Sequence, residues 1–400
     1  MSEAILHDAD RAAYEKMAST EPVWDAIVTG AEGYGHEANL LLHAGPPFAS
    51  VDTISRPILN SACVAAVYEG LAAEFDTAEA MIRSGEIRLE PAQDSAVVTP
   101  LATVVSASMP QHRVHDRNYP ANVVHAPLNG GMRAPMRLGL RSEAVLEHIR
   151  WLNGPWAELI AGALDQPIAV IPIAAGALRR GDDCHGRTPA GTQILMAEVE
   201  QALAGVELDA NQRDFCDNSP PLFLNLWMAA SKCLMLAADG IADSSFVTAA
   251  AGNGVEAGIQ VGGLPGRWFQ TPASPPNGRF DVDLGPERAL PAIGDSAVVE
   301  ALGLGAMALQ LSPEQEQNFA DFLPADYRER AGCLLCGPHP GFGDLDCPLG
   351  LTARAVSAIG KGPIIGLGIL DISGERGRLG GGIYDMPATV FDAAVAALDA

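Results

Sequence analysis

Short apolar runs that alternate with helical repeats are the feature that most constrains the fold of this 400-residue chain. Residues 38–43 form an apolar run that ends in the loop Ala44-Gly45-Pro46-Pro47, and residues 60–75 then repeat apolar residues at helical spacing. Residues 96–107 are rich in valine, threonine and serine, which favours one or two strands. Strands that alternate with helices predict an N-terminal α/β domain over residues 1–141.

Helical patterns dominate the next part of the chain, and they predict a mainly helical domain over residues 142–245. The predicted helices cover residues 143–152, 156–164, 191–204 and 222–238. The last of these is apolar but contains Lys232 near its middle. Because a lysine is costly in lipid, we expect a buried or subunit-facing helix rather than a membrane span.

Residues 246–400 are expected to form a C-terminal α+β domain, which makes the whole chain a multidomain protein of the mixed α/β class. Strands are predicted over residues 246–250, 258–261, 268–271 and 363–372, and helices over residues 296–309, 313–322, 351–359 and 388–398. Asn253-Gly254 predicts a hairpin turn in which both residues have positive φ. Residues 272–294 are rich in proline and glycine and predict a long loop.

The charge of the chain excludes whole classes of partner. Its formal net charge is -24, and only Lys16, Lys232 and Lys361 carry ammonium groups. Nucleic acid and anionic membrane surfaces need a basic face that this composition does not offer. The seven scattered cysteines and the polar, acidic start, which lacks an export signal, favour a reduced protein of the cytoplasm.

The densest polar cluster lies in the segment Gly181-Asp182-Asp183-Cys184-His185-Gly186-Arg187. Here Asp183 could orient His185 for proton transfer while Arg187 holds an anion. Alternatively, the two carboxylates and the imidazole could bind a divalent metal ion. A solvated loop before the next helix is the structural alternative, and the adjacent glycines are compatible with it.

Two further segments carry candidate residues at the ends of predicted elements. His43 stands where a strand ends in a glycine-containing turn, which could present its imidazole to a ligand; a tight structural turn is the alternative. Asp295 and Ser296 stand at a predicted helix start, where free N–H groups favour an anion. Plain capping of that helix explains the same residues.

Glycine-rich turns with arginines form the remaining candidates for anion binding. Asn129-Gly130-Gly131, followed by Arg133 and Arg137, could be a turn that carries an anion clamp, or simply a turn. Residues 376–382 form a basic, glycine-rich segment that could cradle phosphate through its backbone amides. The segment lacks the Walker-A order of residues, so nucleotide binding is not indicated.

An ordered series of short motifs over nearly the whole chain resembles the AllG family of oxamate carbamoyltransferase subunits. The motifs are Leu41-Leu42-His43-Ala44-Gly45-Pro46-Pro47, Ala62-Cys63-Val64 with Tyr68-Glu69-Gly70, Ser106-Ala107-Ser108-Met109-Pro110, Leu128-Asn129-Gly130-Gly131 with Met136-Arg137, Gly181-Asp182-Asp183 with His185 and Arg187, Phe223-Leu224-Asn225-Leu226, Gly266-Arg267-Trp268-Phe269, Gly294-Asp295-Ser296-Ala297, and Cys347-Pro348-Leu349-Gly350-Leu351 with Arg354. Each motif is short, and their common order carries the resemblance.

The resemblance implies a cytoplasmic subunit of an allantoin-breakdown enzyme that converts oxalurate and phosphate to oxamate and carbamoyl phosphate. It also implies a complex with other carbamoyltransferase subunits; a homo-oligomer is the alternative assembly. Such chemistry needs an anion site, a donor to polarise the carbamoyl carbonyl and a base for the attacking nitrogen.

We assign these roles to the candidates as hypotheses. The substrate-binding candidates are Asn129, Arg137, Arg187, Asn225, Asp295 and Ser296, and the catalytic candidates are His43 and His185, with Asp183 orienting the latter. Two rival functions stay open at this point. One is an amidohydrolase, with or without a metal ion on the Asp182 segment, and the other is a non-catalytic scaffold subunit.

Overall fold

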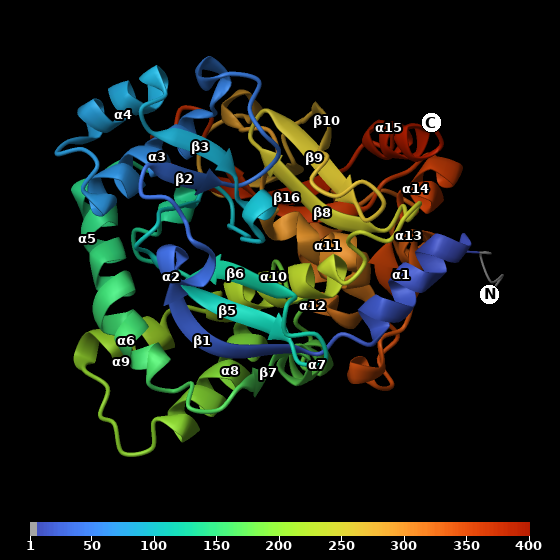
Figure 1. Ribbon diagram of the computed structural model, residues 1–400, viewed down its shortest axis with the longest axis horizontal. Coiled ribbons are helices and arrows are strands. Elements are labelled where there is room, and N and C mark those ends of the chain that lie inside the picture. Colours follow the sequence, from blue (N-terminus) through green and yellow to red (C-terminus); the bar gives the residue numbers. More distant parts are fainter. Residues whose placement is uncertain (1–5) are drawn as a thin grey trace.

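The computed structural model describes residues 6–400, in which helices pack on several small sheets (Figure 1). Two sheets have four strands, in the orders β6-β5-β1-β7 and β10-β9-β8-β12. Two sheets have three strands, β3-β2-β4 and β11-β16-β15, and β13 pairs with β14. These helices and sheets confirm the predicted mixed α/β class. The division into domains 1–141, 142–245 and 246–400 stays a prediction.

The bounds of the elements are as follows. The strands are β1 (Pro22–Thr29), β2 (Leu40–His43), β3 (Arg88–Pro91), β4 (Val104–Val105), β5 (Pro110–Asp116), β6 (Val123–Pro127), β7 (Ile168–Ala169), β8 (Val247–Asn253), β9 (Glu256–Val261), β10 (Phe269–Pro272), β11 (Asn277–Phe280), β12 (Ile293–Gly294), β13 (Leu335–Gly337), β14 (Leu349–Leu351), β15 (Ile364–Leu370) and β16 (Arg378–Asp385). The α-helices are α1 (Asp8–Ala18), α2 (Gly30–Tyr34), α3 (Arg56–Glu69), α4 (Phe75–Ser84), α5 (Glu143–Trp151), α6 (Ala157–Ala161), α7 (Val170–Arg179), α8 (Pro189–Ala202), α9 (Ala210–Asp217), α10 (Leu222–Leu236), α11 (Val298–Leu302), α12 (Pro313–Phe319), α13 (Tyr327–Leu334), α14 (Ala353–Ile359) and α15 (Thr389–Leu398).

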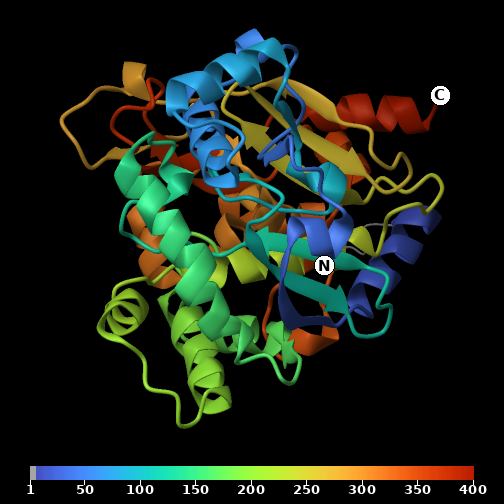
Figure 2. The same ribbon diagram turned by 60° about the vertical axis from the view of Figure 1, so that its left-hand side comes forward.

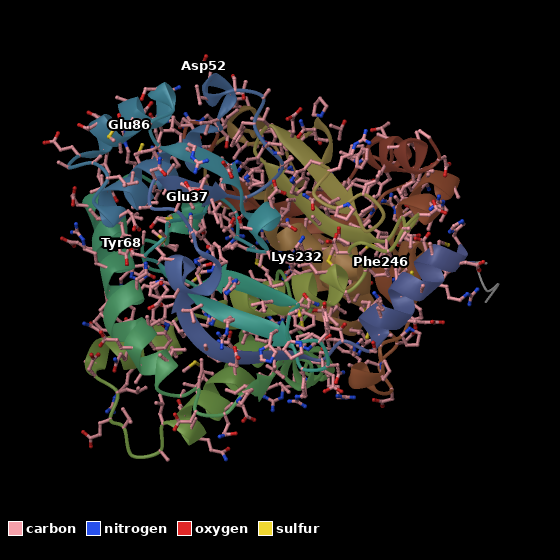
Figure 3. All side chains as sticks on the ribbon, in the orientation of Figure 1. Glu37, Asp52, Tyr68, Glu86, Lys232 and Phe246 are labelled. Atoms are coloured by element: carbon pink, nitrogen blue, oxygen red, sulfur yellow. The ribbon has the colours of Figure 1, made fainter. Side chains whose placement is uncertain are left out.

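Helix α10 is the central element of the larger core. It packs against β5 and β6 of one sheet and β8 of another, and it buries residues on all its faces. This surrounding contact explains why its sequence is apolar throughout, as predicted for a buried helix. Lys232 lies near the middle of the molecule (Figure 3), where it is fully buried and donates to the carbonyl oxygen of Thr248 at 2.7 Å. Within residues 6–400, no helix has the length and apolar character needed to cross a membrane.

A second core lies between the β3-β2-β4 sheet and the helices α3, α4 and α5. Helix α5 continues through a π-helical turn over residues 152–156 into α6, so the three form one helical run. Figure 2 shows this run along one side of the molecule, with α4 near its upper end. The run ends beside the first sheet, and it therefore links the two cores.

Two predicted elements differ from the structure. Residues 96–107 are mostly loop and contain only the short strand β4, because their polar groups are used in contacts with distant segments rather than in a strand ladder. The predicted helix over residues 296–309 is broken into a 3-10 turn, α11 and a second 3-10 segment. The break occurs where Gly303 and Gly305 have φ of 124° and 58°, values that an α-helix does not accept.

The glycine-rich segment 376–382, which could have cradled phosphate as a loop, is largely a strand. Its residues from Arg378 onward belong to β16, which pairs with β15 on one side and β11 on the other. A Cβ atom on Gly380 or Gly382 would collide with the backbone of β11. The glycines therefore permit close strand packing, and the amides of this stretch serve the sheet. The loop expected over residues 272–294 similarly contains β11 and β12.

The predicted hairpin joins β8 and β9, but its turn starts one residue later than expected. Asn253 is the last residue of β8, and Gly254 has the positive φ of 84°. Asn253 instead uses its side chain, because its Oδ1 accepts from the N–H groups of Val255 and Glu256. An asparagine that caps its own turn in this way satisfies donors that the tight turn leaves free.

Candidate functional site

A narrow pocket combines three of the six predicted substrate-binding residues, Asn129, Arg137 and Asn225. It lies between the loop after β6, the segment 135–137, the first turn after α5 and helix α10. Most of its empty space of about 430 Å³ belongs to the open mouth, and little of it lies inside the pocket. His148 and Pro100 also line it. The pocket therefore suits a small molecule of few atoms.

The two asparagines form one buried wall of this pocket. Asn129 Nδ2 donates to Asn225 Oδ1 at 2.9 Å, and Asn129 Oδ1 accepts from the N–H of Gly131 at 2.9 Å. Asn225 Nδ2 donates in turn to the carbonyl oxygen of Pro127 at 2.8 Å. These bonds hold the loop after β6 against α10. An amide nitrogen carries two hydrogens, and each Nδ2 here has a single acceptor within residues 6–400.

Arg137 supplies the positive charge of the pocket. Among residues 6–400, its Nη1 is buried without a hydrogen-bond partner, and its Nη2 contacts only the sulfur of Met132 at 3.7 Å. Within residues 6–400, no carboxylate forms an ion pair with it. Burial, followed by the nearby charge of Arg378, lowers the pKa of the guanidinium to about 10, so it remains charged at neutral pH. A partly buried guanidinium without a counter-ion among residues 6–400 favours an anionic ligand, which would satisfy both its charge and its N–H donors.

His148 on α5 was missed in the sequence, where it is one polar residue of an amphipathic helix. It lines both the pocket and an adjoining groove that contains Trp151 and Phe215. Its Nε2 lies 2.8 Å from the carbonyl oxygen of Gly130. Burial lowers the pKa of His148, the bond to Gly130 opposes that effect, and the charges of Arg133 and Arg137 lower the pKa further. The imidazole is therefore neutral at pH 7.

The segment from Gly181 to Arg187 lies outside this pocket and forms a network of its own. Asp183 Oδ1 accepts from the backbone N–H groups of His185 and Arg187, both at 2.8 Å. The residue that contacts the His185 imidazole is Glu300, whose Oε1 lies 2.7 Å from Nδ1. Asp183 thus holds the backbone of the loop. We had expected Asp183 to orient the His185 imidazole, but that contact comes from Glu300 on α11. Glu300 was missed because only the tertiary structure brings it to this loop.

The charges in this network are largely satisfied by protein groups. Burial lowers the pKa of His185, but the charge and hydrogen bond of Glu300 outweigh that effect and raise the pKa above its ordinary value. Asp182 Oδ2 accepts from the N–H of Gly191 at 2.8 Å, and Arg187 pairs with Glu314 at 2.8 Å. Within residues 6–400, no three histidine, cysteine or acidic side chains are grouped so that they could hold a metal ion.

His43 and Asp295, two separate candidates in the sequence, lie in neighbouring parts of one buried network. Asp295 accepts from the N–H of Gly45 at 3.0 Å, from Gln93 Nε2 at 3.0 Å, and from the N–H and hydroxyl of Thr99 at 2.8 and 3.0 Å. Burial raises the pKa of Asp295 to about 6. The Asp295 carboxylate therefore accepts hydrogen bonds from three chain segments and holds them together. The neighbouring Ser296 is also buried.

The position of His43 is equally enclosed. Its side chain is fully buried, and its Nδ1 lies 2.8 Å from the carbonyl oxygen of Ala44. Its Nε2 is buried and has no hydrogen-bond partner in the described part of the chain. Burial lowers the pKa of His43 to about 4, which keeps the ring neutral. The Asp295 network reaches the pocket indirectly, since Thr99 precedes the pocket residue Pro100. It supports the loop that forms one side of the pocket.

The fold and this pocket define a mixed α/β protein with a small cationic cavity beside its central helix. The family model described as oxamate carbamoyltransferase subunit AllG matches residues 87–296. Oxamate carbamoyltransferase subunit AllG of Escherichia coli K12 is 30% identical over 98% of this chain and 97% of its own length. The chain therefore belongs to the AllG family.

Two further proteins match this chain over most of its length. The uncharacterized protein YahG of Escherichia coli K12 is 30% identical over 97% of this chain and 84% of its own length. A crystal structure of a conserved protein of unknown function from Enterococcus faecalis V583 superposes with a TM-score of 0.91 at 26% identity. It covers 98% of this chain and 97% of that protein, so the two share the whole fold.

Proposed function

We propose that this chain is the subunit of a cytoplasmic carbamoyltransferase that binds a small anionic carbamoyl or ureido compound in the Arg137 pocket. The observation that carries the proposal is the partly buried guanidinium of Arg137, whose Nη1 is buried and which lacks an acidic partner within residues 6–400. A carboxylate or phosphate would supply that partner. The AllG relative is named for oxamate, which has both a carboxylate and a carbamoyl-type amide.

The proposed reaction is the conversion of oxalurate and phosphate to oxamate and carbamoyl phosphate, or the same transfer on a related ureido compound. In this transfer, a phosphate oxygen attacks the ureido carbonyl carbon, the bond from that carbon to the oxamate nitrogen breaks, and the nitrogen receives a proton. Arg137 would hold an anionic group of the substrate. The second N–H groups of Asn129 and Asn225 would stabilise negative charge on a carbonyl oxygen.

Binding of oxamate to the purified chain tests the proposal. We expect calorimetric titration to detect oxamate binding by the wild-type protein and a loss on the order of 2 kcal/mol in Arg137→Gln, which removes a charge-assisted bond. Arg133→Gln is the matched control, because Arg133 is exposed and already pairs with Asp214 at 2.8 Å. It should bind oxamate nearly as well as the wild type. If the wild-type chain binds no oxamate, either alone or with its partner subunits, the result favours the alternative function of a non-catalytic scaffold subunit.

A further inference from the structure

We infer that His148 gives the Arg137 pocket its specificity, by accepting a hydrogen bond from an N–H group of the bound ligand. This inference rests on the proposed function, since it assigns a second contact to the same ligand. Arg137 recognises an anionic end, which many metabolites possess. An acceptor at a second position restricts the ligand to a carboxylate or phosphate compound that also carries an amide or ureido N–H.

The tautomer of His148 follows from one contact. A carbonyl oxygen can only accept, so the 2.8 Å contact with Gly130 means that His148 Nε2 carries a hydrogen. In a neutral imidazole the other nitrogen, Nδ1, is then an acceptor with a free lone pair. Within residues 6–400, Nδ1 has no hydrogen-bond partner, and it is not one of the fully buried polar atoms. The ring thus presents an unused acceptor.

The imidazole that carries this acceptor lines the pocket that also contains Arg137. His148 and Arg137 line the same cavity, and the charge of Arg137 acts on the imidazole. The ring is stacked on Trp151, with centroids 5.9 Å apart, and tilted against Phe215 at 6.0 Å. The bond to Gly130 and these aromatic neighbours hold the ring in one orientation. A rigid acceptor near a cation discriminates between ligands because an ordered group loses little conformational entropy on binding.

A pair of ligands with the same shape isolates this contact. Oxamate and pyruvate both carry a carboxylate next to a carbonyl, but oxamate has an NH2 group where pyruvate has a methyl group. A site that accepts a hydrogen bond from that NH2 group rejects the methyl analogue. The methyl group would cover the acceptor of the site and leave that acceptor without a partner. We expect wild-type protein to bind oxamate on the order of tenfold more tightly than pyruvate.

Two substitutions separate the roles of the two ring nitrogens. In His148→Asn, the amide oxygen can occupy the position of Nδ1 and keep the acceptor, but the bond to Gly130 is lost. In His148→Gln, the amide nitrogen can reach Gly130, but no acceptor remains at the position of Nδ1. We expect His148→Asn to retain most of the preference for oxamate and His148→Gln to lose it. Thermal melting of both variants, measured with and without ligand, checks that they are folded.

The outcomes of this experiment distinguish the inference from the proposed function. If Arg137→Gln weakens both ligands equally, while His148→Gln loses the preference for oxamate and His148→Asn retains it, both proposals stand. The opposite result, in which His148→Gln retains the preference for oxamate and His148→Asn loses it, would overturn the inference. The preference would then depend on the bond to Gly130, and the histidine would only position the loop. An unchanged ratio in both variants, or a wild-type protein without preference, would also overturn it. Failure of the wild type to bind either ligand would overturn the proposed function itself.

Discussion

Glu300 Oε1 lies 2.7 Å from Nδ1 of His185, and the carboxylate of Glu300 is fully buried. The same oxygen accepts from the N–H groups of Ala306 and Gly366, each at 3.1 Å. One side chain of α11 therefore joins the loop before α8, the segment after α11 and strand β15. A buried carboxylate with these partners holds the fold together, and its loss leaves several donors unsatisfied.

The His185–Glu300 pair should make stability depend on pH in the neutral to alkaline range. The pKa of His185 is raised in the folded protein above its ordinary value of 6.5. The stabilisation by the charged imidazole is therefore fully present below pH 6.5 and is lost as pH rises through the raised pKa. Urea unfolding at a series of pH values above 6.5 should show this decline. The double variant His185→Gln/Glu300→Gln should lack it, and an equal decline in that variant would assign it to other groups.

Removal of Glu300 should lower the free energy of unfolding far more than removal of a surface carboxylate. Glu300→Ala leaves the protonated His185 and two backbone donors without an acceptor, and we expect a loss of about 3–5 kcal/mol in the free energy of unfolding. Glu314→Ala is the matched control, because Glu314 pairs with Arg187 at the surface, where such a pair contributes about 0–1 kcal/mol. Similar losses in the two variants, measured by urea unfolding, would contradict the structural role of Glu300.

Arg187 and Arg137 are rival candidates for the anion site. Arg187 has carboxylate neighbours in Glu314 and Asp182, whereas Arg137 has none within residues 6–400. Arg187→Ala should therefore leave oxamate affinity unchanged and alter stability by less than about 1 kcal/mol. Arg137→Ala should weaken oxamate by about 2 kcal/mol or more, and removal of its buried charge should not lower stability strongly. The reverse pattern in calorimetric titrations would move the site to the Asp182 segment.

Asn253 should be important for stability and unimportant for ligand binding. Its Nδ2 donates to the carbonyl oxygen of Pro46 at 2.9 Å, and its Oδ1 accepts from two backbone N–H groups of the turn. Because the side chain is fully buried, Asn253→Ala should cost about 2–3 kcal/mol, more than an exposed turn residue would. Asn253→Asp keeps the acceptor and loses the donor, so its cost should be smaller than that of alanine. A loss of oxamate affinity without a loss of stability would identify Asn253 as a ligand contact.

Local patterns in the sequence determined most of the helices and several strands. The apolar repeat of α10, the apolar run of β2 and the glycine after Asn253 depend on neighbours within one or two turns of the chain. Strands β1 and β5 escaped prediction, because neither alternates strictly: β1 is mostly apolar with Asp25 inside it, and β5 is mostly polar. The breaks at Gly303 and Gly305 also escaped it, because glycine is compatible with several conformations and only packing selects one.

Only the tertiary structure decided which candidate residues share a site. Asn129 and Asn225 were proposed from separate motifs, and a 2.9 Å hydrogen bond joins them in one wall of the pocket. His148 and Glu300 carried no local signal, since a histidine or glutamate on a helix usually faces solvent. Each acquires its role from partners far along the chain, Gly130 for His148 and His185 for Glu300. Periodicity records which face of an element is buried, whereas the residues that meet across that face are set by how the elements pack.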